Sequence, residues 1–136
     1  SHLFDTSTTN SRITERWTGL TLTIPIVTTQ DATDVIAHSC TGNGNITATG
    51  GVNATRRGFC YKVGTSGDPT ISDSIAYDNG DFGTGAFNKS ITGLLQRTGY
   101  RIRAYATNSV GTAYGVTVQA TTPSRVSTGI VMFYRS

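Results

Sequence analysis

The chain has 136 residues, 36% of them hydrophobic, so it is long enough for one domain with a core of its own. Its 11 basic and 8 acidic residues give a formal net charge of +3. Nucleic-acid binding needs a clustered basic surface, and this small positive excess does not indicate one. No stretch approaches the roughly 18 consecutive apolar residues that cross a membrane, so no membrane span is predicted.

Residues 1–24 are expected to form an N-terminal extension that ends in a strand. Leu20, Leu22 and Ile24 alternate with threonines, and Pro25 marks a boundary because proline cannot donate to a strand ladder. The chain begins without a Met or a leader segment, which indicates either a removed signal or a piece of a longer protein. Together with the many Thr, Ser and Gly residues, this favours an extracellular, cell-surface or virion protein.

Residues 25–122 have the pattern of a single β-sandwich. Short runs with strand-like alternation recur about every ten residues, separated by turns rich in Gly, Asn and Asp. The expected strands cover residues 26–30, 35–47, 56–63, 71–77, 86–91, 100–107 and 113–121, with turns that include residues 31–34 and 78–81. This spacing predicts an all-β sandwich of about seven strands.

Two glycines are expected to face the core. Gly42 and Gly44 have the parity of the inward-facing residues of their strand. Because glycine leaves space that a large side chain must fill, we expect the bulky face formed by Phe59, Tyr61 and Val63 to pack against them.

Several short motifs between residues 26 and 122 occur together in one protein family. They include residues 41–47, 57–61, 92–94, 103–109 and 111–115. With these motifs the segment resembles the fibronectin type III-like repeats of bacterial surface and secreted proteins and of phage structural proteins. The resemblance implies an immunoglobulin-like sandwich without catalytic residues or cofactors. It also implies a tyrosine corner, in which Tyr100 bonds the backbone near Leu94 with Thr98 beside it.

Residues 123–136 are expected to form a strand-forming C-terminal extension. Its apolar run consists of Ile130, Val131, Met132, Phe133 and Tyr134. Apolar strand-formers outside a complete sandwich indicate pairing with an edge strand. If that edge belongs to a neighbouring subunit, the pairing builds a fibre. The alternative is that both extensions add strands to their own domain.

Cys40 and Cys60 allow two interpretations. A disulfide between them would close a loop of about 20 residues and stabilise the fold by roughly 3 kcal/mol, and paired cysteines are usual in secreted proteins. Alternation instead places Cys40 on the inward face and Cys60 on the outward face of their strands, which favours two separate buried residues.

Asp78, Asn79 and Asp81 are the best candidates for a metal site. Their oxygen atoms suit calcium, but the spacing is not that of a calcium-binding loop and the same residues are typical of a solvated turn. The other carboxylates are scattered and neither histidine has a recognisable catalytic partner. No metal, cofactor or enzymatic activity is therefore predicted.

Arginines of two neighbouring strands are expected to gather on one sheet. Arg101, Arg103 and Tyr105 alternate outward on one strand, Arg97 lies just before that strand, and Arg56 and Arg57 lie on the other. This face could offer charge and aromatic contact to an anionic glycan or an acidic partner. The alternative is an ordinary solvated face.

The leading hypothesis is a non-enzymatic structural module that self-assembles through its terminal strands into an extracellular filament or a virion surface. Its expected partners are further copies of the chain or neighbouring surface proteins. The alternative is an adhesion or glycan-binding module that uses Arg101, Arg103 and Tyr105.

Overall fold

The computed structural model describes residues 21–124, which fold into two packed β-sheets. The strands are β1 (Ile26–Ile36), β2 (Ser39–Ala48), β3 (Ala54–Val63), β4 (Ser74–Phe82), β5 (Gly85–Thr92), β6 (Gly99–Thr107) and β7 (Thr112–Thr121). No helix occurs within residues 21–124. The prediction of an all-β sandwich of about seven strands is confirmed.

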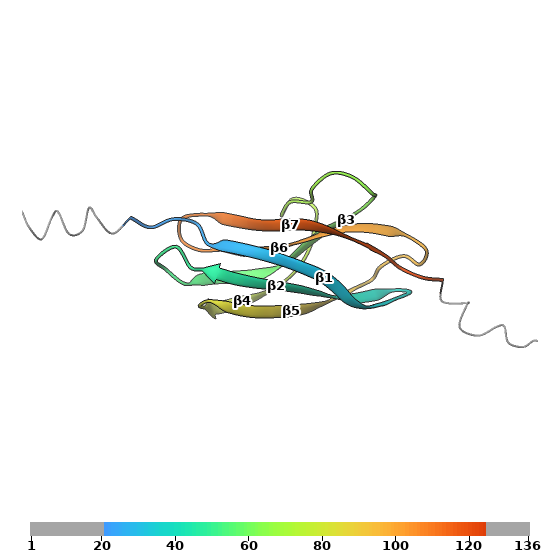
Figure 1. Cartoon of the computed structure of the whole chain (residues 1–136), viewed down its shortest axis with the longest axis horizontal. Coiled ribbons are helices and arrows are strands. Elements are labelled where there is room, and N and C mark those ends of the chain that lie inside the picture. Colours follow the sequence, from blue (N-terminus) through green and yellow to red (C-terminus); the bar gives the residue numbers. More distant parts are fainter. Residues whose placement is uncertain (1–20, 125–136) are drawn as a thin grey trace, which may run out of the picture.

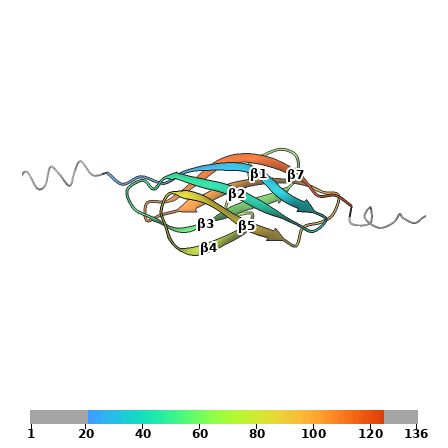
Figure 2. The ribbon, with the colours of Figure 1, turned by 60° about the horizontal axis from the view of Figure 1, so that its bottom comes forward.

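One sheet has the order β1-β2-β5 and the other the order β4-β3-β6-β7, with antiparallel neighbours throughout. Figures 1 and 2 show the sheets face to face, with β1 beside β7 along one side. A Cβ atom at Gly115 of β7 would collide with Thr29 of β1, so the strands touch and close that side. On the opposite side, Lys89 of β5 forms a salt bridge of 2.9 Å with Asp78 of β4.

The core lies between the sheets and is built from the inward residues of the alternating strands. It consists of Val27, Cys40, Ile46, Ala54, Phe59, Phe87, Ile91, Leu94, Tyr100, Ile102, Ala104, Ala106 and Ala113. The ring of Phe59 fills the space at Gly42, where a Cβ atom would lie 2.8 Å from the ring, as predicted. At Gly44 the space is filled partly by Phe87. The prediction that Val63 packs against these glycines is wrong, because Val63 is 59% exposed.

Strand β1 is longer than predicted. The expected turn at residues 31–34 is wrong, because β1 continues to Ile36, which pairs with Ser39 of β2. The register becomes irregular after Gln30, and Asp34 has a φ of 51°. Irregularities of this kind bend an edge strand and accommodate extra polar residues without ending it.

The turn expected at residues 78–81 is also wrong. Those residues belong to β4, which begins at Ser74, and Asp78 pairs with Arg57 of β3. Since β4 is an edge strand of its sheet, polar residues and glycine are tolerated along it. The turn into β5 lies at residues 83–84.

The chain enters the sandwich at one end, which we call the entry end (Figure 1). Residues 21–25 have no strand structure, so the predicted strand is wrong for residues 21–24. Thr23 instead donates its N–H to the carbonyl of Gly50 at 2.9 Å and accepts from the side-chain amide of Asn108 at 2.8 Å.

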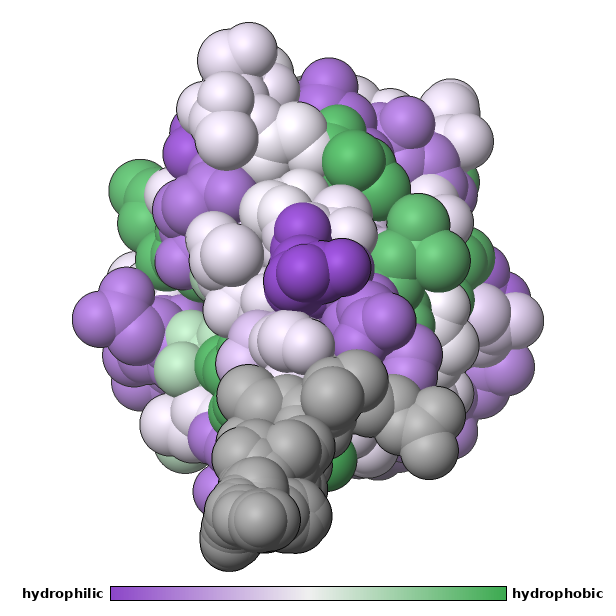
Figure 3. Space-filling view, turned by 90° about the vertical axis from the view of Figure 1, so that its right-hand side faces the viewer, coloured by the Kyte–Doolittle hydropathy of each residue, from purple (hydrophilic) through white to green (hydrophobic). Residues whose placement is uncertain are grey.

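The chain leaves at the opposite end, which we call the exit end. There the buried hydroxyl of Thr122 donates to the carbonyl of Leu95 and accepts from the N–H of Thr98 at 3.0 Å. Seen from this end, hydrophobic and hydrophilic side chains both lie around the departing chain (Figure 3). The predicted assembly residues Leu20, Ile130, Val131, Met132, Phe133 and Tyr134 lie outside the described residues.

A hydrogen-bonded corner joins β5 to β6. The hydroxyl of Tyr100 accepts the N–H of Leu95 at 2.8 Å, next to the buried side chain of Leu94. The hydroxyl of Thr98 donates to the carbonyl of Gln96 at 2.8 Å. The bond of Tyr100 is the one that the family resemblance implies for a tyrosine corner, and the Thr98 bond lies beside it.

Candidate binding face of the four-stranded sheet

The outward side chains of the β4-β3-β6-β7 sheet stand in rows, because the antiparallel ladders bring residues of the four strands level. The row nearest the entry end, which we call the open row, consists of Asn79, Arg56, Thr107 and Thr112. The next, which we call the tyrosine row, consists of Tyr77, Gly58, Tyr105 and Tyr114. The rows beyond it, toward the exit end, include Cys60, Arg103 and Thr117, then Lys62, Arg101 and Gln119.

The loop between β3 and β4, residues 64–73, folds back over the rows near the exit end. Arg101 Nε donates to the carbonyl of Gly67 at 3.1 Å, and Arg103 Nε donates to the carbonyl of Pro69 at 2.7 Å. Both arginines therefore hold the loop against the sheet.

The proposed ligand face of Arg101, Arg103 and Tyr105 is consequently occupied in part by the chain itself. Tyr105 is only 1% exposed, although it alternates outward on β6 as predicted. The three side chains are together, but each arginine already uses its Nε in a bond to the loop, and the tyrosine is buried. Alternation along β6 indicates the direction of a side chain and contains no information on the path of a loop that follows another strand.

Arg56 and Arg57 lie on opposite faces of β3. The guanidinium of Arg57 turns toward the interior side, 4.0 Å from the ring centre of Phe82 and 5.1 Å from that of Phe87. Arg56 lies on the outer face, over the ring of Tyr77 at 4.2 Å. Of the arginines expected on this face, Arg56 is the one that belongs to the open row.

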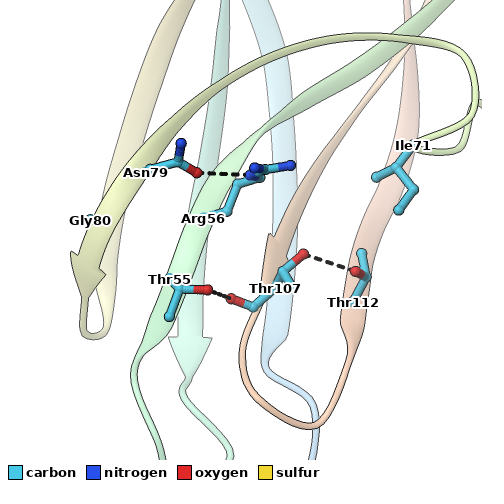
Figure 4. A pocket seen from close by; sticks show the side chains of 7 residues that line it. All are labelled: Thr55, Arg56, Ile71, Asn79, Gly80, Thr107 and Thr112. Atoms are coloured by element: carbon cyan, nitrogen blue, oxygen red, sulfur yellow. Dashed lines mark hydrogen bonds between the residues drawn. The ribbon is translucent and has the colours of Figure 1, made fainter.

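The open row borders a hollow of about 540 Å³ (Figure 4). The hollow is lined by Thr55, Arg56, Ile71, Asn79, Gly80, Thr107 and Thr112. Arg56 Nε donates to Asn79 Oδ1 at 2.8 Å, and the hydroxyls of Thr107 and Thr112 lie 2.8 Å apart. Its volume is within the range of small-molecule sites, about 300–1,000 Å³.

A buried hydroxyl lies next to this hollow. The Tyr105 hydroxyl has no hydrogen-bond partner among the described residues. Burial raises the pKa of Tyr105 to about 12, and the nearby positive charge of Arg56 opposes that rise. An unpaired buried polar group of this kind destabilises a fold by about 1–3 kcal/mol.

Cys40 and Cys60 are both free, buried thiols in different sheets, so the disulfide interpretation is wrong. Cys40 faces the core and Cys60 lies under the β3–β4 loop, with its sulfur 3.5 Å from the carbonyl of Pro69. Burial raises the pKa of Cys40 and raises that of Cys60 to about 11. Both thiols therefore stay protonated at neutral pH, which makes them poor nucleophiles and metal ligands.

Asp78, Asn79 and Asp81 do not converge on a common point. Their side chains bond respectively to Lys89, Arg56 and Asn53. Within residues 21–124, no three His, Cys, Asp or Glu side chains come close enough together to hold a metal ion. The same part of the chain contains no helix that could cross a lipid bilayer.

Two solved structures similar to this chain are of the sensor domain of the anti-sigma factor RsgI4 from Pseudobacteroides cellulosolvens. A short version has a TM-score of 0.56 and 11% identity over 74% of this chain and 96% of that one. A solution structure has a TM-score of 0.57 and 14% identity over 83% of this chain and 88% of that one. Such low identities indicate a common fold and do not transfer a function. No protein-family model and no curated protein matches the sequence.

Proposed function

We propose that the chain is a non-enzymatic structural module that assembles head to tail into an extracellular filament or a virion surface. The observation that carries this proposal is the entry and exit of the chain at opposite ends of the sandwich (Figure 1). A contact between the exit end of one copy and the entry end of the next joins two different surfaces. Such a contact repeats without closing and forms a linear array.

Apolar side chains at both ends support this proposal. At the entry end Leu22 is 47% and Ile24 43% exposed, and at the exit end Ile36 is 59% and Leu95 61% exposed. Covering apolar surface of this kind contributes about 25 cal/mol per Å² buried. The first and last described residues, 21 and 124, lie at these same two ends.

The sheet edges are less suited to accept a strand from a neighbour. On one side β1 and β7 touch each other at Thr29 and Gly115. On the other side the edge strands carry the charges of Asp78 and Lys89. Packing and charge both protect edge strands from pairing with another chain. This favours contacts between the extensions, at the ends of the sandwich, over strand addition along its sides.

The test compares the native particle mass of the full chain with that of the chain lacking residues 125–136. We expect large, regular particles from the full chain in light scattering and electron microscopy. The shortened chain should remain a folded monomer, because all seven strands lie within residues 26–121. Removing residues 1–20 instead should also abolish assembly, since a head-to-tail contact needs both ends.

A full chain that stays a monomer of 14.4 kDa would contradict the proposal. Unfolding of the chain shortened at residue 124 would also contradict it, because the extension would then complete the core of its own domain.

A further inference from the structure

The hollow over the open row is lined mostly by polar residues, whereas the β3–β4 loop lies over the rows nearer the exit end. The β3–β4 loop reaches the tyrosine row at Ile71, whose N–H donates to the hydroxyl of Tyr114 at 3.1 Å. Beyond Ile71 the hollow lies open to solvent. Figure 4 shows the side chains that line it. Ile71 is the one apolar side chain among the residues that line it, and the others are threonines, an asparagine, an arginine and a glycine.

The polar groups of the hollow are mainly hydrogen-bond donors with unused capacity. Asn79 uses its carbonyl oxygen to accept from Arg56 Nε, which leaves the amide NH₂ of Asn79 for another partner. The same bond uses only Nε of Arg56, so the terminal nitrogens of its guanidinium, which lies 4.2 Å from the ring centre of Tyr77 and close to the Tyr105 hydroxyl, keep donor capacity for a ligand. Within residues 21–124 one salt bridge forms, between Lys89 and Asp78. Arg56 therefore forms no ion pair with an acidic residue in that part of the chain.

Hydroxyl groups surround these donors. Thr107 and Thr112 share one hydrogen bond of 2.8 Å, so one of their two hydroxyl hydrogens is left for a ligand. The Thr55 hydroxyl makes only a long bond of 3.4 Å, to the carbonyl of Thr107. The buried hydroxyl of Tyr105 is close to the Arg56 guanidinium. Burial raises the pKa of Tyr105, and the positive charge of Arg56 acts against this effect.

This combination fits one class of ligand. A guanidinium without a carboxylate, next to an amide donor, suits a carboxylate in a charge-assisted pair. The hydroxyls suit a ligand that itself carries several hydroxyls. A peptide would find no pocket for an apolar anchor beside the single Ile71, and a nucleic acid needs several phosphate-binding cations.

We propose that the open row binds an acidic sugar, a uronic acid unit of a polysaccharide. Its carboxylate is held by Arg56 and the amide of Asn79, and its hydroxyls are held by Thr107 and Thr112. The site lies within one sheet of one copy, so it does not depend on the assembly of the chain.

The test is isothermal titration calorimetry of the full chain with a short oligogalacturonate. We expect binding that weakens as salt is raised, because part of the affinity is an ion pair near the surface. Arg56→Gln should lower the affinity about tenfold, the effect of losing one charge-assisted hydrogen bond. Asn79→Asp keeps the size of the side chain but places a carboxylate beside Arg56. It should abolish binding, because this carboxylate pairs with Arg56 and repels the carboxylate of the ligand.

The matched control is Arg97→Gln, which makes the same charge change at the exposed turn between β5 and β6. It should leave the affinity unchanged. Thermal unfolding of all three variants checks that each is folded, and Asn79→Asp keeps the test decisive if Arg56→Gln unfolds.

Three results would overturn the proposal. The first is no heat on addition of oligogalacturonate to the unmodified chain. The second is equal binding of the methyl-esterified, uncharged oligosaccharide. The third is an equal loss of affinity in Arg97→Gln and Arg56→Gln, which would indicate general attraction to a basic protein.

Discussion

The hydroxyl groups of two tyrosines of β6 differ in their hydrogen bonding. The Tyr100 hydroxyl accepts the N–H of Leu95 at 2.8 Å, whereas the Tyr105 hydroxyl is buried without a partner in the described residues. A hydrogen bond contributes about 1 kcal/mol to stability, and an unpaired buried group opposes folding by a similar or larger amount. The two side chains should therefore respond in opposite ways to loss of the oxygen.

We predict that Tyr105→Phe raises the free energy of unfolding by about 1 kcal/mol, because it removes a polar group that has no partner. Urea unfolding followed by circular dichroism measures the change. The matched variant Tyr100→Phe should lower the free energy of unfolding by about 1 kcal/mol, because it leaves the Leu95 N–H unpaired. Destabilisation of equal size in both variants would show that the Tyr105 hydroxyl has a partner, such as a buried water.

At the scale of the elements, strand β1 provides a hydrogen-bond acceptor at a point where the ladder of the other sheet is irregular. The β6–β7 register shifts between Arg103 and Tyr105, so the ladder passes over Ala104. The N–H of Ala104 donates instead to the hydroxyl of Thr29 on β1, at 3.0 Å. A buried backbone donor is thus satisfied across the sandwich, and it fixes β1 against β6.

We predict that Thr29→Val lowers the free energy of unfolding by about 1–3 kcal/mol, because the valine leaves the Ala104 N–H buried and unpaired. Thr28→Val is the matched control on the neighbouring residue, whose hydroxyl accepts an exposed bond from Gln30. It should change stability by less than about 0.5 kcal/mol. Chemical denaturation of both variants provides the comparison, and equal effects would rule out the role given to Thr29.

Strands with regular alternation could be predicted from the sequence, including the edge strands β5 and β7, whereas the bounds of β1 and β4 could not. Strand β6 packs one face against the core and pairs on both sides, so its alternation of Ile102 and Ala104 with arginines is regular. Strands β1 and β4 lie at sheet edges, where ladder bonds are needed on one side only. Residues 31–34 and 78–81 therefore combine turn-like composition with strand structure.

The candidate site depends on the whole molecule and was only partly predictable. The sequence indicates that Arg56, Arg101 and Arg103 lie on neighbouring strands, and the register bears this out. It contains no pattern for the path of residues 64–73, whose carbonyls accept hydrogen bonds from Arg101 and Arg103 and not from Arg56. The loop is held through the backbone carbonyls of Gly67 and Pro69. Every residue type has such a carbonyl, so the residue types of the loop do not reveal these contacts.

The opposite positions of the entry and exit ends also determine how the fold responds to mechanical force. A pull on the two extensions acts along the strands, so it loads the hydrogen bonds between β1 and β2 in shear, all at once, because those bonds lie perpendicular to the strands. Attachment at residue 24 and at Ser109, both at the entry end, would instead peel the strands apart bond by bond. In single-molecule pulling we expect a higher rupture force between residues 24 and 124 than between residues 24 and 109, and the reverse order would contradict this. A filament of such modules would be strongest in the direction in which it is stretched.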